Sequence, residues 1–340
     1  MSARKADEDL FLSGRTEEDV QEEMNKVIIL LGPTGAGKTG VSLLLAKELG
    51  TEIISADSMQ IYRHMDIGTA KPTRLQRSVV THHMIDIIGP HESFSTGQYI
   101  RMVSPVIEEL HREGRIPVVV GGTGLYIKAM TRGIFSGPSA DWPLREKLRS
   151  MEKKEAGSLY ASLKELDPVT AAKITANDSR RIIRALEVCI KGSNTISAMQ
   201  ENFTRPLPFE FIKVGLKRDR KELYNLIEGR VDEMMLAGLV DEVRTVMKQV
   251  SVYLNHRVQA SPLPSLQAIG YKEIAQFLNG FITLDEAVSL IKRNTKRYAK
   301  RQFTWFSKEE GIHWVDATGV HDSNEICRNV CKIIKGSLVQ

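Results

Sequence analysis

A glycine-rich segment at residues 32–39 constrains the fold of this 340-residue chain more than any other feature. It fits the pattern G-x-x-x-x-G-K-[ST], in which backbone amides surround a phosphate group. An apolar run at residues 27–31 precedes it, and residues 37–49 carry apolar side chains at helical spacing. A strand, a glycine-rich loop and a helix in this order predict a phosphate-binding loop in an α/β protein. The loop residues are Gly32, Pro33, Thr34, Gly35, Ala36, Gly37, Lys38 and Thr39.

The composition of this loop indicates a diphosphate or triphosphate ligand. Lys38 supplies a positive charge, the Thr39 hydroxyl can reach phosphate or Mg²⁺, and the helix N-terminus adds a favourable dipole. The same motif occurs in ATP-binding proteins, so it does not define the reaction. An NTP hydrolase usually carries an acidic residue at the end of a second apolar strand. Here the best such run, at residues 118–120, continues into glycines, which weighs against an ATPase, although Asp57 and Asp86 also follow strand-like runs.

The remainder of the chain predicts a parallel sheet with a helical insertion. Short apolar runs at 53–56 and 117–122 alternate with a helical pattern at 103–112, and a further strand-like run occupies 211–217. This order is typical of a parallel α/β sheet flanked by helices, as in P-loop NTPases. The parts we expect are a flexible extension (1–25), an α/β core (26–138), a helical insertion domain (139–206), a return to the core with C-terminal helices (207–320), and a tail helix (321–340).

Local signals also place helix ends inside the expected insertion domain. Asp167 followed by Pro168 predicts the start of one helix, because aspartate caps a helix and proline fits its first turn. Gly192 predicts the end of another.

Composition excludes several other classes of protein. No run of about 18 apolar residues occurs, and the first 25 residues lack the apolar centre of a signal peptide, so we expect a cytoplasmic protein without a membrane segment. We also expect a monomer. Cys189, Cys327 and Cys331 are too few for a disulfide framework. The pair Cys327 and Cys331 has no second pair nearby, so the sequence predicts no zinc site there.

The distribution of charge permits a polyanionic partner. The net charge is +5, but residues 1–26 carry eight acidic and four basic residues, which leaves +9 for the rest of the chain. A basic body of this kind is compatible with nucleic acid, although a solvated basic surface is also common in proteins that bind none.

Several motifs in order resemble the tRNA dimethylallyltransferases, also called tRNA isopentenyltransferases, from about Lys26 to Asp316. Any single motif would only be suggestive, whereas the ordered set is highly specific. Within this family, the chain is similar to the bacterial type. The matching segments are 32–39, 57–62 (Asp-Ser-Met-Gln-Ile-Tyr), 66–72 (Asp-Ile-Gly-Thr-Ala-Lys-Pro), 121–126 (Gly-Gly-Thr-Gly-Leu-Tyr), 177–178 with 184–188, 269–272 (Ile-Gly-Tyr-Lys), and 297–305.

The resemblance implies transfer of a dimethylallyl group from dimethylallyl diphosphate to tRNA. The acceptor would be the exocyclic N6 amine of the adenine immediately 3′ of the anticodon, in tRNAs that read codons beginning with U. Pyrophosphate would be the leaving group, with Lys38 and a Mg²⁺ ion held through Thr39 stabilising its charge.

The resemblance also assigns roles to single residues. Asp57 would be the general base, since the amine of adenine is a poor nucleophile. Arg230 would lie near the pyrophosphate, Thr123 would touch the target nucleotide, and Arg145 would contact the tRNA. Further tRNA contacts would come from Ser58, Met59, Gln60, Arg180, Arg181, Arg184, Gln267, Ala268, Ile269, Gly270, Tyr271 and Lys272.

A basic helix at residues 292–305 predicts an additional RNA-facing surface. Its cations recur at helical spacing and would form one broad basic face. Tyr298, Phe303 and Trp305 lie between them and could stack on bases, although core contacts are the favoured interpretation. The cations are Lys292, Arg293, Lys296, Arg297, Lys300 and Arg301.

Three alternative functions remain open from the sequence. An adenylate isopentenyltransferase shares the phosphate loop and the aspartate, but the helical insertion and the segment 267–272 favour tRNA as acceptor. A small-molecule or nucleotide kinase would leave the segment 66–72 and the basic helix unexplained. An RNA-binding protein with a relic phosphate loop is disfavoured because Lys38, Thr39 and Asp57 are all present.

Overall fold

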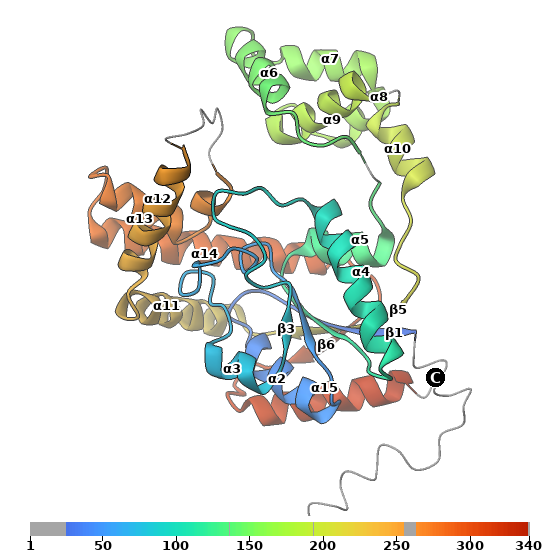
Figure 1. Cartoon of the computed structure of the whole chain (residues 1–340), viewed down its shortest axis with the longest axis vertical. Coiled ribbons are helices and arrows are strands. Elements are labelled where there is room, and N and C mark those ends of the chain that lie inside the picture. Colours follow the sequence, from blue (N-terminus) through green and yellow to red (C-terminus); the bar gives the residue numbers. More distant parts are fainter. Residues whose placement is uncertain (1–24, 136, 193, 255–262, 339–340) are drawn as a thin grey trace, which may run out of the picture.

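The core of the molecule is a six-stranded parallel sheet with the order β3-β2-β4-β1-β5-β6 (Figure 1). The computed structural model describes residues 25–135, 137–192, 194–254 and 263–338. The predicted flexible extension lies almost wholly outside the described residues. The strands are β1 (Lys26–Leu31), β2 (Ile53–Ala56), β3 (His82–His83), β4 (Val118–Gly121), β5 (Glu210–Lys217) and β6 (Ile312–Asp316).

Helices cover both faces of this sheet and form a separate group at one end of the molecule (Figure 1). They are α2 (Lys38–Glu48), α3 (Arg74–Val79), α4 (Thr96–Arg112), α5 (Gly124–Arg132), α6 (Trp142–Lys154), α7 (Ser158–Leu166), α8 (Pro168–Lys173), α9 (Ser179–Lys191), α10 (Ile196–Phe203), α11 (Arg220–Leu236), α12 (Leu239–Leu254), α13 (Tyr271–Leu278), α14 (Leu284–Phe306) and α15 (Ser323–Leu338), with a 3₁₀ turn η1 at Ser265–Gln267.

The position of β1 explains its continuous apolar sequence. It lies between β4 and β5, and each of its residues is buried. One of its faces packs on α2 and α15, and the other packs on α4 and α5. Because β1, β2 and β4 are parallel, their carboxyl ends open onto the same edge of the sheet. That edge brings the loops after Leu31, Ala56 and Gly121 together.

Two parts of the sheet were not predicted from the sequence. β3 has only two residues. β6 is a short edge strand of five residues that mixes the apolar Ile312, Trp314 and Val315 with His313 and Asp316. β6 pairs with β5. The helix predicted as a tail is an integral part of the core, because α15 buries its apolar side against α2 and the sheet (Figure 1).

Helices α6 to α10 form the predicted helical insertion and have their own hydrophobic core. The expected helix ends within it are confirmed. Asp167 is 1% exposed, accepts a hydrogen bond from the amide of Thr170 at 3.0 Å, and Pro168 opens α8. α9 ends at Gly192. Along the longest axis of the molecule, these helices lie at the end opposite α15 (Figure 1).

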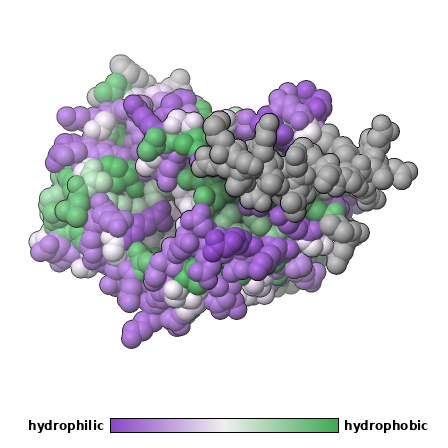
Figure 2. Space-filling view, turned by 90° about the horizontal axis from the view of Figure 1, so that it is seen from below, coloured by the Kyte–Doolittle hydropathy of each residue, from purple (hydrophilic) through white to green (hydrophobic). Residues whose placement is uncertain are grey.

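A helix that crosses a membrane must be both long and apolar. None of the helices within the described ranges has the length and apolar character needed to cross a bilayer. Viewed from the α15 side, hydrophobic residues form separate patches among hydrophilic ones (Figure 2). Exposed apolar side chains scattered in this way are ordinary for a folded protein.

Candidate active site

A cavity of about 550 Å³ opens at the carboxyl edge of the sheet. The glycine-rich loop forms one wall, and the segments after β2 and β4 form the floor. Residues from α11 and α14 close the other side. The polar side chains that line it are Thr34, Lys38, Thr39, Ser42, Ser55, Asp57, Gln60, Thr69, His82, Asn225, Arg230, Glu233, Tyr298, Gln302 and Ser323.

The glycine-rich loop has the geometry of an anion cradle. Gly35 and Gly37 have φ angles of 83° and 98°, a left-handed conformation that side chains disfavour, and Gly37 is the N-cap of α2. The ammonium group of Lys38 folds back on the loop and donates to the carbonyls of Gly32 at 3.0 Å and Pro33 at 2.9 Å. Since Gly37 has no side chain to cap α2, the amides of this helix end remain available to a phosphate group.

Two cations face this cavity. The Arg230 guanidinium from α11 donates to the Thr34 hydroxyl at 3.4 Å, so it lies directly beside the loop. Burial lowers the pKa of Lys38 to about 8, and the nearby charge of Arg230 adds to this shift, while Asp57 partly opposes it. A cation whose charge is disfavoured in the empty cavity gains most when an anion arrives. Lys38 and Arg230, which the sequence predicted separately, therefore lie together as a candidate anion site.

The predicted base and the predicted nucleotide contact also meet at this edge. Asp57 follows β2, and its Oδ1 accepts hydrogen bonds from the amides of Met59 at 2.8 Å and Gln60 at 3.3 Å. The amide of Ser58 donates to the Thr123 hydroxyl at 3.0 Å, which ties this turn to the loop after β4. Asp57 and Thr123 are thus held in fixed positions beside the anion site.

Two residues of α14 line the cavity although the sequence analysis did not predict them as site residues. The Gln302 side chain is 7% exposed, accepts a hydrogen bond from the amide of Thr34 at 2.9 Å, and donates to the carbonyl of Gly122 at 2.9 Å. It therefore connects the glycine-rich loop to the loop after β4. Tyr298, one turn earlier, hydrogen bonds to Thr123, and burial together with the charge of Asp57 raises its pKa.

The favoured interpretation of the α14 aromatics as core contacts is only partly accurate. Trp305 packs on the core beneath α5, whereas Tyr298 faces the cavity and Phe303 is 45% exposed beside Trp314. The spacing of Tyr298 and Gln302, four residues apart on one helical face, is the signal that could have identified both.

The segment 66–72, which forms part of the cavity wall, is anchored from outside by Glu242 of α12. The Glu242 carboxylate accepts the amides of Asp66 at 2.9 Å, Ile67 at 2.8 Å and Gly68 at 3.0 Å, and also the hydroxyl of Tyr271. Four donors on one carboxylate fix this segment in place. Glu242 is a further residue that the sequence did not predict.

This anchor changes the interpretation of the segment 267–272. The side chains of Ala268 and Tyr271 are 7% and 0% exposed, so neither can touch RNA in this arrangement. Gly270 has a φ of 96°, which lets the chain turn into α13 and brings Tyr271 onto Glu242. The polar side chains of Gln267 and Lys272 are exposed, and both remain predicted tRNA contacts. The apolar side chain of Ile269 is partly exposed and also remains a predicted contact.

We expect Glu242→Ala to lower the free energy of unfolding by about 3 kcal/mol, because the substitution removes the shared acceptor of three amides and a buried hydroxyl. Urea unfolding monitored by circular dichroism measures this change. Asp241→Ala, at the exposed neighbouring position, is the matched control and should cost about 0.5 kcal/mol or less. Equal losses in the two variants would show that the anchor does not matter.

Two of the four predicted arginine contacts in the insertion domain are engaged within the protein. Glu187 is fully buried and accepts hydrogen bonds from Arg145 at 2.8 and 2.7 Å and from Arg184 at 2.5 Å. Burial alone would raise the pKa of Glu187, but the bonds from Arg145, from the Asp141 amide and from Arg184 outweigh it and lower that pKa. Arg145 therefore joins α6 to α9, whereas Arg184 pairs with Glu187 within α9 and also donates to the carbonyl of Pro138 at 3.0 Å.

The other two arginines are exposed at the start of α9, where an RNA could reach them. Arg181 lies 3.4 Å from Asp178, an exposed pair that binds weakly, and Arg180 is exposed beside it. Arg180 and Arg181 thus remain predicted tRNA contacts.

The sequence predicted that all six cations of α14 form one broad basic face. In the structure this face is narrower, because two of the six pair with acidic residues of α11. Lys292 pairs with Asp232 at 2.6 Å, and Lys296 pairs with Glu228, so these two lysines face α11. The spacing alone could not show this, because the acidic partners lie about sixty residues earlier. The exposed cations of the helix are Arg293, Arg297, Lys300 and Arg301.

Comparison with known proteins gives consistent matches along most of the chain. The family model described as IPP transferase matches residues 60–309. A tRNA dimethylallyltransferase of Thermodesulfovibrio yellowstonii is 56% identical over 305 residues, which cover 90% of this chain and 96% of that protein. Another, from Thermotoga maritima, is 45% identical over 309 residues, covering 91% and 98%.

Solved structures agree with these matches. The full-length tRNA isopentenylpyrophosphate transferase from Bacillus halodurans is 40% identical, with a TM-score of 0.66 over 92% of this chain and 97% of that one. A eukaryotic dimethylallyltransferase acting on tRNA is 27% identical, with a TM-score of 0.75 over 93% of this chain and 79% of that one. The motifs, the fold and these matches agree, and the chain belongs to the IPP transferase family.

Proposed function

We propose that this enzyme transfers the dimethylallyl group of dimethylallyl diphosphate to the N6 amine of the adenine immediately 3′ of the anticodon in tRNAs that read codons beginning with U. The observation that carries the proposal is the single cavity that joins an anion site at Lys38 and Arg230 to a carboxylate at Asp57. A transferase of this kind needs a diphosphate cradle and a base on opposite sides of the reacting carbon. The identity to proteins named tRNA dimethylallyltransferase supports the same reaction.

The diphosphate would bind against the amides of the glycine-rich loop, with Lys38 and Arg230 neutralising its oxygens. The Thr39 hydroxyl lines the same cavity and is a hard oxygen donor of the type that Mg²⁺ prefers. When bound, Mg²⁺ would add positive charge where the pyrophosphate leaves. The carbon–oxygen bond breaks with its electron pair passing to pyrophosphate, and these groups stabilise that charge.

In the same cavity, Asp57 would accept the proton of the attacking amine as the new carbon–nitrogen bond forms. An adenine stacked in an anticodon loop cannot reach a cavity, so the nucleotide must turn out of the stack. Thr123, whose hydroxyl accepts a hydrogen bond from the Ser58 amide, would contact the flipped base. The tyrosine hydroxyl of Tyr298 lines the same wall.

The exposed cations of α14 would bind the phosphates of the tRNA. We expect the triple substitution Arg293→Gln, Arg297→Gln and Lys300→Gln to weaken tRNA binding and to reduce the slope of log Kd against log salt by about 2, since fewer phosphates are neutralised. Binding isotherms at several salt concentrations measure the slope. The double substitution Lys292→Gln and Lys296→Gln is the control, because those lysines pair with α11 and should leave the slope unchanged. The reverse pattern would move the RNA surface to the α11 side.

Binding of the diphosphate should depend on pH through Lys38. Its pKa of about 8 in the free protein means that the ammonium form is lost as the pH rises through 8, whereas the bound anion needs that form. The Kd of an unreactive thio analogue of dimethylallyl diphosphate should be nearly constant below about pH 7.5 and rise by up to about tenfold per pH unit above 8. Calorimetric titration without Mg²⁺ measures it. Lys38→Arg, which stays charged, should remove the break, and a break that persists in this variant belongs to another group.

The nearest alternative differs only in the acceptor. An adenylate isopentenyltransferase would use the same cradle and the same carboxylate, but it would not need the exposed arginines at the start of α9 or the cations of α14. Radiolabelled dimethylallyl diphosphate with Mg²⁺ should label unmodified tRNA and leave AMP unlabelled. Label in AMP alone would assign the chain to the free-nucleotide reaction, and label in neither would remove the prenyltransferase proposal.

The setting of the reaction follows from its substrate. We propose that the enzyme works as a monomer in the cytoplasm, where unmodified tRNA is available and where its three cysteines stay reduced. Analytical ultracentrifugation of the protein, with and without tRNA, measures its molecular mass in solution and so tests whether it is a monomer.

A further inference from the structure

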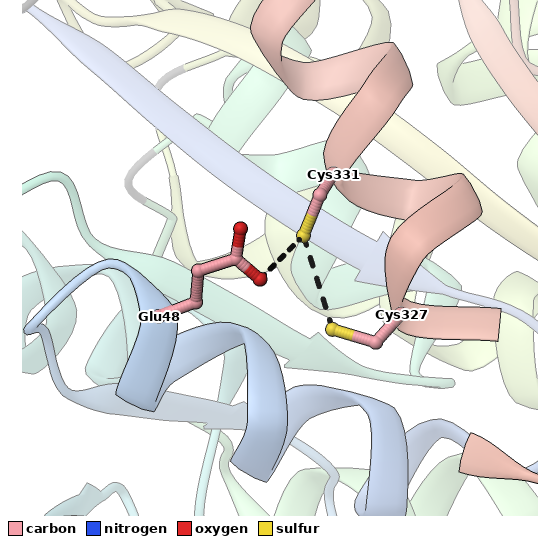
Figure 3. Close-up of side chains that lie close together, drawn as sticks. All are labelled: Glu48, Cys327 and Cys331. Atoms are coloured by element: carbon pink, nitrogen blue, oxygen red, sulfur yellow. Dashed lines mark hydrogen bonds between the residues drawn. The ribbon is translucent and has the colours of Figure 1, made fainter. Parts of the chain in front are cut away.

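A second cluster of ligand atoms lies at the far end of the phosphate-loop helix. Cys327 and Cys331 stand one turn apart on α15, and Glu48 is the last residue of α2 (Figure 3). The two cysteine sulfurs and one carboxylate oxygen of Glu48 all lie within 4.8 Å of one another. The two thiols are almost fully buried, at 4% and 7% exposure, and point toward the carboxylate (Figure 3).

Two distances in this cluster are close to those between ligand atoms of a tetrahedral metal site. The sulfur atoms of Cys327 and Cys331 are 3.8 Å apart, and the Cys331 sulfur is 3.2 Å from Oε2 of Glu48. With zinc–sulfur bonds of about 2.3 Å, two thiolates of a tetrahedral site lie about 3.8 Å apart. With a zinc–oxygen bond of about 2.0 Å, a thiolate and a carboxylate oxygen lie about 3.5 Å apart. These two pairs of ligand atoms would need to shift by only a few tenths of an ångström, and the Cys327 sulfur lies within 4.8 Å of a Glu48 carboxylate oxygen.

The chemistry of the three donors selects the class of ion. Two thiolates favour a thiophilic ion over Mg²⁺ or Ca²⁺, and the carboxylate suits Zn²⁺. Two thiolates and one carboxylate around Zn²⁺ leave one net negative charge, which Lys335 offsets from 3.7 Å away on the other oxygen of Glu48. Three described residues fill three positions, and a water molecule would complete the fourth.

We infer that Cys327, Cys331 and Glu48 form a zinc-class metal site that fastens α15 to α2. The site is separate from the active-site cavity, since Glu48 lies ten residues after Lys38 on α2 and is therefore about 15 Å from it along the helix. At the other end of this helix pair, a Cβ on Gly40 would lie 2.5 Å from the hydroxyl of Ser323, so the helices are also in close contact beside the glycine-rich loop. The metal would fix the end of the pair that lacks this contact. This role does not depend on the proposed prenyl transfer.

The test uses Cd²⁺ as a probe of thiolate coordination. The chain has three cysteines, so Cys189→Ser leaves this pair as the only source of a thiolate-to-metal absorption band. We expect one equivalent of Cd²⁺, added to reduced, chelator-treated and tag-free protein, to produce that ultraviolet band fully. The further substitutions Cys327→Ala and Cys331→Ala should abolish it. Glu48→Gln, at an exposed position that cannot prevent folding, should keep the band but weaken Cd²⁺ affinity about tenfold or more.

Thermal unfolding gives a second readout that is independent of enzyme activity. Zn²⁺ at about a hundred times its Kd should raise the melting temperature of Cys189→Ser by about 5 °C and leave the variant without the pair unchanged. No cadmium band at one equivalent in Cys189→Ser, or an equal band after removal of Cys327 and Cys331, would overturn the site. An unchanged Cd²⁺ affinity in Glu48→Gln would remove the carboxylate from it.

Discussion

We expect Asp57→Asn to lower the turnover of tRNA by about 10²-fold or more and to change the Kd for tRNA by less than about twofold. The amide can still accept the hydrogen bonds that Asp57 receives from Met59 and Gln60, so the turn keeps its shape, but it cannot take a proton from the amine. Single-turnover kinetics with saturating substrates measure the chemical step, and filter binding measures the affinity.

Comparing Asp57→Ala with Asp57→Asn separates the proposed role of this carboxylate as a base from its role as a hydrogen-bond acceptor in the turn. Asp57→Ala removes both the base and the hydrogen-bond acceptor, so it should be at least as slow as Asp57→Asn and also less stable. Normal turnover in Asp57→Asn would assign the base to another group. A loss of tRNA affinity equal to the loss of turnover would make Asp57 a binding residue.

The second large effect is expected at Lys38. Lys38→Ala should reduce kcat/KM for dimethylallyl diphosphate by about 10² to 10³, because it removes a preorganised cation from the position where the pyrophosphate charge develops. Steady-state kinetics with varied diphosphate at saturating tRNA measure this ratio. Lys47→Ala, at an exposed position near the other end of α2, is the matched control and should retain normal kinetics. A small effect at Lys38 would mean that Arg230 and the loop amides suffice.

Local sequence patterns predicted the elements whose features lie close together along the chain. The apolar run expected at 27–31 is β1 at Lys26–Leu31, and the helix expected at 37–49 is α2 at Lys38–Glu48. These two elements are marked by a continuous buried run and by a glycine-rich turn, both of which are strong local signals. β6 was missed because an edge strand of five residues that includes histidine and aspartate has no comparable pattern.

The site was predictable to the extent that its residues belong to recognisable motifs. The structure brings Lys38, Arg230 and Asp57 to one cavity, and a hydrogen bond from the Ser58 amide holds Thr123 next to the turn that carries Asp57. It was not predictable that Gln302 would connect two of these loops, since the residue lies 268 positions from Thr34.

Contacts between distant helices account for the other differences. Glu242 reaches the segment 66–72 from about 175 residues away, and Glu48 lies 283 residues before Cys331. Lys292 and Lys296 have a helical spacing that suits RNA, but their acidic partners on α11 are invisible in that spacing. In each case the partner is set by tertiary packing, which no local pattern records.

The most direct test of the central proposal is mass spectrometry of tRNA after reaction with the enzyme, dimethylallyl diphosphate and Mg²⁺. Nuclease digestion should place one dimethylallyl group on the adenine immediately 3′ of the anticodon, and Asp57→Asn should leave that nucleotide unmodified over the same time. A dimethylallyl group at any other nucleotide, or tRNA that stays unmodified while the diphosphate is consumed, would contradict the account.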